Sequence, residues 1–172
     1  MIVLIAGTTH SGKTLAAQKL LEKYKFPYLS IDHLKMGLIR SGLTDISVCD
    51  DERLTPYLWS IVKEIIKTAI ENGQNLIVEG CYIPFYWQKD FEENYLKEIK
   101  YFCLIMTERY IENSFDKILQ HGCVIEKRLD NSCDKEELKK QNAKNLRLCK
   151  LYKLNYVLID EKYSVEIDLK ND

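Results

Sequence analysis

The segment Gly7-Thr8-Thr9-His10-Ser11-Gly12-Lys13-Thr14 constrains this chain more than any other, because it fits the pattern G-x-x-x-x-G-K-[ST]. It follows an apolar run, residues 2–6, that predicts a buried strand, and it precedes residues 15–23, whose Leu and Ala side chains recur at helical spacing. A strand, a glycine loop and a helix are the context in which this pattern binds phosphate. The loop turns its backbone N–H groups toward phosphate oxygens, and the helix start adds the positive end of its dipole.

All eight residues of this phosphate loop, Gly7 to Thr14, are therefore candidate nucleotide contacts. We expect Lys13 to reach the outer phosphates and the Thr14 hydroxyl to help hold Mg²⁺. The alternative is a glycine-rich turn that binds nothing. A chance match in a chain of ordinary composition occurs on the order of once in a hundred sequences or less. The motif thus predicts binding of a nucleoside triphosphate.

Length and charge set the outer limits. With 172 residues the chain is predicted to form one domain, 1–172, large enough for a sizeable core. Twenty-five basic and 26 acidic side chains give a formal net charge of −1, so no overall charge would recruit nucleic acid or a membrane surface. No apolar run approaches the length of a membrane span. Because a strand is expected from the first residues onward, we expect no signal peptide.

The six cysteines contain no C-x-x-C pair, and the three histidines are scattered. Without a secretory signal, we expect reduced thiols in a cytoplasmic protein. A metal other than Mg²⁺ is not expected.

Strand-like and helix-like patterns alternate along the chain. After the first helix, residues 27–31 and 75–78 read as strands, as do 99–105 and 156–159. Thr55-Pro56 predicts a helix start for a helix that ends at Asn72-Gly73, and residues 43–53 before it have no clear period. The remaining helices are expected over 33–40, 84–97, 108–119 and 134–150. This alternation predicts an α/β fold with a parallel sheet and helices on both faces.

These features resemble the P-loop small-molecule kinases, the nucleoside- and nucleotide-kinase-like family related to adenylate kinase, chloramphenicol phosphotransferase and the zeta toxins. The resemblance rests on the N-terminal phosphate loop, on Asp32 after the second strand, and on Glu79 at the end of the third. It implies a three-layer fold with a five-stranded sheet of order 2-3-1-4-5, with ATP and Mg²⁺ as cofactors. It also implies an arginine-bearing lid between the fourth and fifth strands.

The two acids have separate expected roles. By resemblance, Asp32 binds or deprotonates the acceptor hydroxyl, and Glu79 is the acid that holds Mg²⁺, partly through water. Both follow strand ends, where ligands bind in open α/β sheets. The alternatives are that Asp32 caps the helix over 33–40 and that Glu79 is a solvated acid.

For the lid we expect residues 120–137, with Arg128 and Arg109 as the preferred phosphate clamps. Either arginine could instead be an ordinary surface charge. Residues 135–153 hold seven basic and two acidic side chains, a pattern that favours an exposed helix face. The alternative is that these basic residues attract a phosphorylated acceptor or RNA. Aromatic residues after Glu79 could stack on an acceptor ring, but core packing is favoured; these residues are Tyr82, Phe85, Tyr86 and Trp87.

Together these observations predict an ATP- and Mg²⁺-dependent phosphotransferase that moves the γ-phosphate to a hydroxyl or phosphate of a small molecule. Two alternatives stay open: a kinase acting on RNA or a nucleotide sugar, and a nucleotide-binding regulator without transfer activity. The sequence names neither the acceptor nor the oligomeric state.

Overall fold

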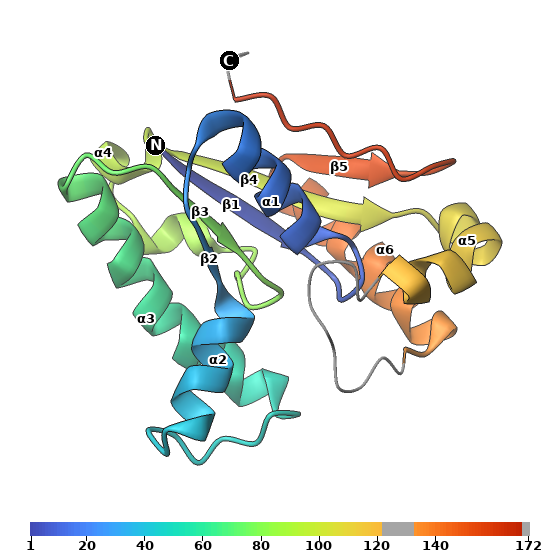
Figure 1. Ribbon diagram of the computed structural model, residues 1–172, viewed down its shortest axis with the longest axis horizontal. Helices are drawn as coiled ribbons and strands as arrows, with labels where there is room; N and C mark the ends of the chain where they lie inside the picture. The colour runs from blue at the N-terminus through green and yellow to red at the C-terminus, as the bar shows by residue number, and fades with distance from the viewer. Residues whose placement is uncertain (122–132, 170–172) are drawn as a thin grey trace.

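The computed structural model describes residues 1–121 and 133–169, which build one five-stranded parallel sheet (Figure 1). The strand order is β2-β3-β1-β4-β5, as the resemblance implied. Strand β1 lies in the centre and pairs in parallel with β3 and β4. The strands are β1 (Ile2–Gly7), β2 (Tyr28–Ser30), β3 (Leu76–Glu79), β4 (Ile99–Met106) and β5 (Tyr156–Ile159).

Helices cover both faces of the sheet, which explains why β1 is apolar at every position rather than alternating. Val3 and Ile5 face the layer built by α1 (Lys13–Tyr24) and α5 (Glu108–His121). The other side chains of β1 face α2 (Ile31–Arg40), α3 (Asp51–Glu71) and the C-terminal half of α6 (Lys135–Leu151). In the part of the chain that the structure describes, no helix is long and apolar enough to cross a membrane.

An extended segment, residues 160–169, follows β5 and returns along α1 (Figure 1, red). Three alternate side chains, Val165, Ile167 and Leu169, are buried against the α1 layer. The hydroxyl of Tyr24 in α1 donates to Asp168 over 2.6 Å and accepts from the Leu169 N–H. This segment therefore covers α1 without adding a strand to the sheet.

Helix α3 begins at Asp51, so the predicted start at Thr55-Pro56 is wrong. The Asp50 carboxylate caps the helix and accepts from the Arg53 N–H at 3.2 Å. That cap satisfies one free N–H of the first turn, whereas Pro56 merely lacks a donor and lies within the helix. Helix α2 likewise begins earlier than expected, at Ile31, with Ser30 at the N-cap position.

The single helix expected over 84–97 is also wrong. The chain forms a 3₁₀ turn, η1 (Trp87–Asp90), and one short turn of helix, α4 (Glu93–Leu96). Phe91 between them is extended, with φ −129° and ψ 141°, and is buried edge-on against two tryptophans, Trp59 and Trp87. The extended backbone of Phe91 interrupts the helical hydrogen bonds, so residues 84–97 cannot form one continuous helix.

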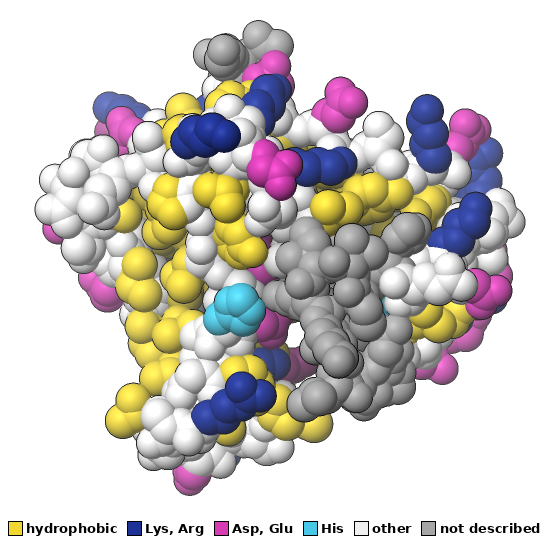
Figure 2. All heavy atoms as spheres, viewed as in Figure 1, with side chains coloured by type: hydrophobic (Ala, Val, Ile, Leu, Met, Phe, Trp, Pro, Cys, Tyr) yellow, Lys and Arg dark blue, Asp and Glu magenta, His cyan; other side chains and the backbone are white. Residues whose placement is uncertain are grey.

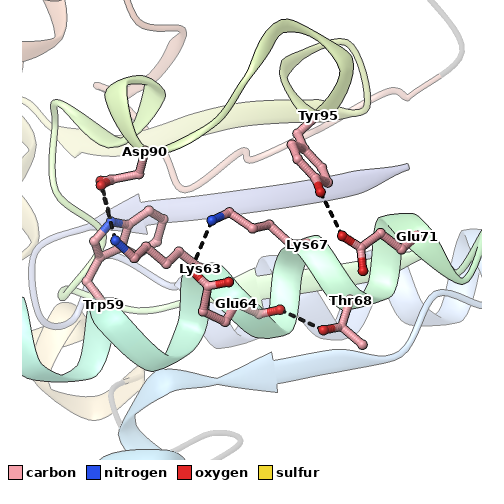
Figure 3. Close-up of polar contacts among 8 residues, drawn as sticks. All are labelled: Trp59, Lys63, Glu64, Lys67, Thr68, Glu71, Asp90 and Tyr95. Atoms are coloured by element: carbon pink, nitrogen blue, oxygen red, sulfur yellow. Dashed lines mark hydrogen bonds and ion pairs between the residues drawn. The ribbon is translucent and has the colours of Figure 1, made fainter.

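Asp90 fastens this segment to α3 (Figure 3). Its carboxylate accepts from Trp59 Nε1 at 2.9 Å and lies 3.3 Å from Lys63 Nζ. The contact anchors on α3 the segment that follows β3.

We expect Asp90→Ala to lower the free energy of unfolding by about 1–3 kcal/mol, because it leaves the buried Trp59 N–H without an acceptor. Asp90→Asn keeps that acceptor and should lose less. Glu64→Gln, which alters only an exposed pair with Lys67, is the matched control and should leave stability nearly unchanged. Urea unfolding of the three variants measures the differences; equal losses for Asp90→Ala and Glu64→Gln would contradict the anchoring role.

Candidate functional site

The phosphate loop joins β1 to α1 and requires glycine at two positions. Gly7 has φ +145°, and a Cβ there would lie 2.7 Å from both the Leu104 carbonyl oxygen and Ser11 Oγ. Gly12 is the N-cap of α1 with φ +81°, and a Cβ there would overlap the Tyr163 hydroxyl. That hydroxyl donates to the Gly12 carbonyl over 3.1 Å. The segment after β5 thus packs directly on the loop.

Lys13 is the buried cation of the loop, with only 5% of its surface exposed. Its Nζ donates to the Thr8 carbonyl oxygen over 2.8 Å, and Ser11 Oγ donates to the same oxygen over 2.8 Å. Burial by itself disfavours the ammonium, but the nearby Cys81, Glu79 and Asp32 outweigh it and raise the pKa of Lys13. The side chain is therefore a fixed positive charge within the loop.

Glu79 lies beside the start of α1, as expected from the resemblance. Strand β3 places it next to Ile5 of β1, and it is 1% exposed. The Thr14 hydroxyl donates to Glu79 Oε1 over 3.3 Å. A carboxylate and a hydroxyl oxygen together are ligands of the kind that Mg²⁺ accepts, directly or through water. The structure brings the two predicted metal residues together.

Asp32 lies in the first turn of α2, one residue beyond the first position of the helix. It is not the helix cap, because Ser30 occupies the cap position. Its carboxylate is partly exposed and lies 3.4 Å from Lys35 Nζ. Its charge helps to raise the pKa of Lys13, so the acid that follows β2 and the loop cation lie within electrostatic reach of each other.

Three side chains extend this site away from the loop, and their hydrogen bonds have a defined direction. Lys35 Nζ, in a side chain that is 12% exposed, donates to the Tyr82 hydroxyl over 2.8 Å. That hydroxyl donates in turn to Asp51 Oδ1 over 2.8 Å. Burial and the bond to Asp51 raise the pKa of Tyr82, so the phenol keeps its proton. We name Asp32, Lys35, Asp51 and Tyr82 the acceptor-side network.

The acceptor-side network comes from three elements that meet only in the folded chain: α2, the start of α3 and the segment after β3. Figure 2 shows acidic and basic side chains gathered in a hollow beside α2. Two carboxylates, one ammonium and one phenol hydroxyl can together donate and accept hydrogen bonds. This set suits a polar ligand better than an apolar one.

Of the two arginines predicted for the lid, the structure describes only Arg109. Arg128 lies outside the described residues, as does most of the predicted lid, while the ends of that range lie in α5 and α6. Arg109, in the first turn of α5, forms ion pairs with Asp160 and with Glu161. The guanidinium, together with a hydrogen bond from Thr107, holds the pKa of Asp160 below its usual value. The structure does not place Arg109 against the loop, and its role as a clamp stays a prediction.

Some side chains of the aromatic and basic segments have structural contacts, and others are exposed. Trp87 is buried and stacks on Tyr101 with ring centroids 5.8 Å apart, whereas Tyr86 is exposed. Lys135 and Lys139 of α6 pair with Glu112 of α5. Five further basic residues are exposed and, among the described residues, lack an ion pair: Lys140, Lys144, Arg147, Lys150 and Lys153. Nucleic-acid binding through 135–153 stays a prediction.

Several site residues escaped sequence reasoning. Lys35 stands three positions after Asp32, which puts it on the same helix face, and that spacing could have indicated it. Asp51 and Tyr82 had no such signal. No sequence signal indicated Asn142 of α6, which bonds to the phosphate loop across 134 residues. None indicated Tyr163, which bonds to Gly12.

The parallel strand order 2-3-1-4-5, with helices on both faces, is that of the P-loop NTPase α/β fold. Solved structures share it: a candidate kinase from Chloroflexus aurantiacus is 17% identical with a TM-score of 0.54, and covers 97% of this chain and 91% of its own. A gluconokinase from Sinorhizobium meliloti is 14% identical with a TM-score of 0.51, over 92% and 81%. Deoxyadenosine kinase from M. mycoides is 14% identical with a TM-score of 0.50, over 93% and 90%. No protein-family model and no curated protein matches the sequence.

Proposed function

We propose that this protein is a phosphotransferase that moves the γ-phosphate of ATP to a hydroxyl of a small polar molecule, with Mg²⁺ as cofactor. One observation carries the proposal: the phosphate loop holds the buried cation Lys13, and the Thr14 hydroxyl that follows it donates to the buried Glu79. Glu79 and Asp32 are also close enough to raise the pKa of Lys13. Phosphoryl transfer requires charge cancellation on the phosphates and a positioned acceptor, and these four side chains supply groups for both.

The roles follow from the chemistry of each group. Lys13 and the inward N–H groups of the loop would bind the β- and γ-phosphates. Asp32 would accept a hydrogen bond from the acceptor hydroxyl, whose oxygen attacks the γ-phosphorus as the bond to the β–γ bridging oxygen breaks. The hydroxyl proton passes to the Asp32 carboxylate and then to solvent, and ADP leaves. Lys35 and Tyr82 would orient the rest of the acceptor.

Thr14 and Glu79 are the residues that fit Mg²⁺, since both offer oxygen atoms at the start of α1. When bound, the ion neutralises phosphate charge. The residues themselves hold the site: Glu79 is fixed by its strand, and Thr14 by the first turn of α1.

The direct test is a screen of hydroxyl-bearing metabolites with ATP and Mg²⁺, in which formation of ADP and of a phosphorylated product are both measured. We expect at least one polar acceptor to raise ADP formation above the rate with water alone. A regulator would instead bind nucleotide and show no stimulation by any acceptor. That outcome, with tight ATP binding, would replace the phosphotransferase proposal.

Glu79→Gln tests the metal site. The amide oxygen can still accept from Thr14, so the change removes the charge and keeps that contact. We expect the Mg²⁺ concentration for half-maximal turnover to rise about 10- to 100-fold, as for lost partners of other metal sites. Calorimetric titration of ATP at several Mg²⁺ concentrations should show the same loss without relying on turnover. The exposed Glu92→Gln is the control; an unchanged Mg²⁺ dependence in Glu79→Gln would remove Glu79 from the site.

An RNA acceptor is a second candidate, supported by the five exposed cations of residues 140–153 that lack ion pairs among the described residues. Contacts to phosphates make binding fall steeply with salt, because counterions are released. Binding of a labelled single-stranded RNA that persists at moderate salt would favour this candidate over a small molecule.

A further inference from the structure

Asn142 is a buried polar residue that the proposed reaction does not use. It is 2% exposed and belongs to α6, whereas the other buried polar side chains among the described residues come from the phosphate loop or from the ends of β2 and β3: Thr8, Ser11, Lys13, Ser30 and Glu79. A buried amide is costly unless its groups are bonded. Its partners therefore indicate why it is there.

The hydrogen bonds of Asn142 fix the orientation of its amide. The Met106 N–H, at the end of β4, can only donate, so the atom 2.8 Å away is Oδ1. The Leu138 carbonyl can only accept, so the atom 2.8 Å from it is Nδ2. The second N–H of Nδ2 then donates to Thr8 Oγ1 over 3.1 Å. No other orientation satisfies all three partners.

Thr8 is the residue on which the loop's own contacts converge. Its carbonyl oxygen receives Lys13 Nζ and Ser11 Oγ, and its hydroxyl receives Asn142. Asn142, on α6, therefore bonds to the side chain of Thr8, and the Thr8 carbonyl accepts from Lys13 within the loop. Its third bond, to Met106, ties the same amide to the central sheet.

We propose that Asn142 is a positioning residue for the phosphate loop: through Thr8 it fixes the loop shape and the Lys13 ammonium, and it links α6 to nucleotide binding. This inference rests on the proposed function, because it assumes that the loop binds nucleotide. A preorganised loop binds phosphate more tightly, since less order must be imposed when the ligand arrives.

The test is a double-mutant cycle on ATP affinity, measured by calorimetry with Mg²⁺ at a temperature where every variant is folded. Thr8→Val removes the acceptor and keeps the shape; Asn142→Leu removes the donor and keeps the approximate volume. We expect each to weaken ATP binding on the order of tenfold, the effect of about 1.4 kcal/mol. The double variant should lose about as much as either single one, because both remove the same contact.

Thr8→Ser keeps the hydroxyl and should restore affinity. Gln141→Ala changes an exposed neighbour on α6 that donates to Glu137, and it should leave affinity unchanged. Should Asn142→Leu fail to fold because the Met106 N–H is left unpaired, Thr8→Val against Thr8→Ser decides alone. A purely structural Asn142 would lower the melting temperature and leave the ATP affinity of the folded variants intact, which overturns the inference. If the parent protein binds no ATP, the proposed function falls as well.

Discussion

Replacing Lys13 by Met is expected to lower turnover on the order of 10²- to 10³-fold and to weaken ATP binding sharply. Lys13 is the buried cation of the loop, and loss of one preorganised charge or donor in an active site commonly has an effect of this size. Methionine keeps the apolar stem, so the chain should fold. The lysine ammonium donates to the Thr8 carbonyl, and in the variant that oxygen still accepts from Ser11 Oγ.

Calorimetric titration with ATP, together with circular dichroism to check the fold, measures this effect. The matched control is Lys89→Met, which removes an exposed lysine far along the chain from the loop. A folded Lys13→Met variant with normal ATP affinity and turnover would contradict the phosphate-loop interpretation. No assignment of the acceptor could rescue it.

Replacing Asp32 by Asn should have the second large effect, and on a different quantity. We expect phosphoryl transfer to fall about 10²- to 10⁴-fold, the range that general-base catalysis contributes, while ATP·Mg²⁺ affinity changes little. The amide can still accept a hydrogen bond, but it cannot take up the acceptor proton. Asp32 pairs with Lys35, whereas Glu79 accepts from Thr14, so the two acids have different partners.

The measurement separates kcat from nucleotide affinity, with single-turnover kinetics for the transfer step. Asp45→Asn, an exposed acid between α2 and α3, serves as the control. Normal transfer by Asp32→Asn would leave Asp32 as a helix residue that pairs with Lys35, and the proposed kinase would lose its acceptor-side base. Weak ATP binding by this variant would instead move Asp32 to the nucleotide side.

Local patterns carried much of the fold. The run 2–6 and the glycines at 7 and 12 specify a buried strand, a left-handed turn and a helix start from neighbouring residues alone. The strand at 156–159 was predicted with its observed bounds. The strand order came from the family resemblance, and the structure confirms it. The placement of Glu79 beside Thr14 follows from that order, because β3 pairs with β1.

Where competing local signals met, the sequence reading failed. For α3, the Thr55-Pro56 signal was preferred to the acid that caps the helix. For residues 84–97, Pro84 suggested the start of one helix, but Phe91 is extended and is buried against Trp87. Helix periodicity cannot show this, because the positions of those rings are set by Trp59 on another element.

The site divides in the same way. The sequence by itself determined the phosphate loop, since a loop that surrounds phosphate with backbone N–H groups needs glycines at fixed spacing. Only the tertiary structure determined the acceptor-side network, the Asn142 bond to Thr8 and the Tyr163 bond to Gly12. These contacts join residues 31 to 151 positions apart, except for the Asp32–Lys35 pair. Hydrogen bonds over such separations depend on how the helices pack on the sheet. The sequence pattern of one helix or strand does not show which distant residue will lie beside it.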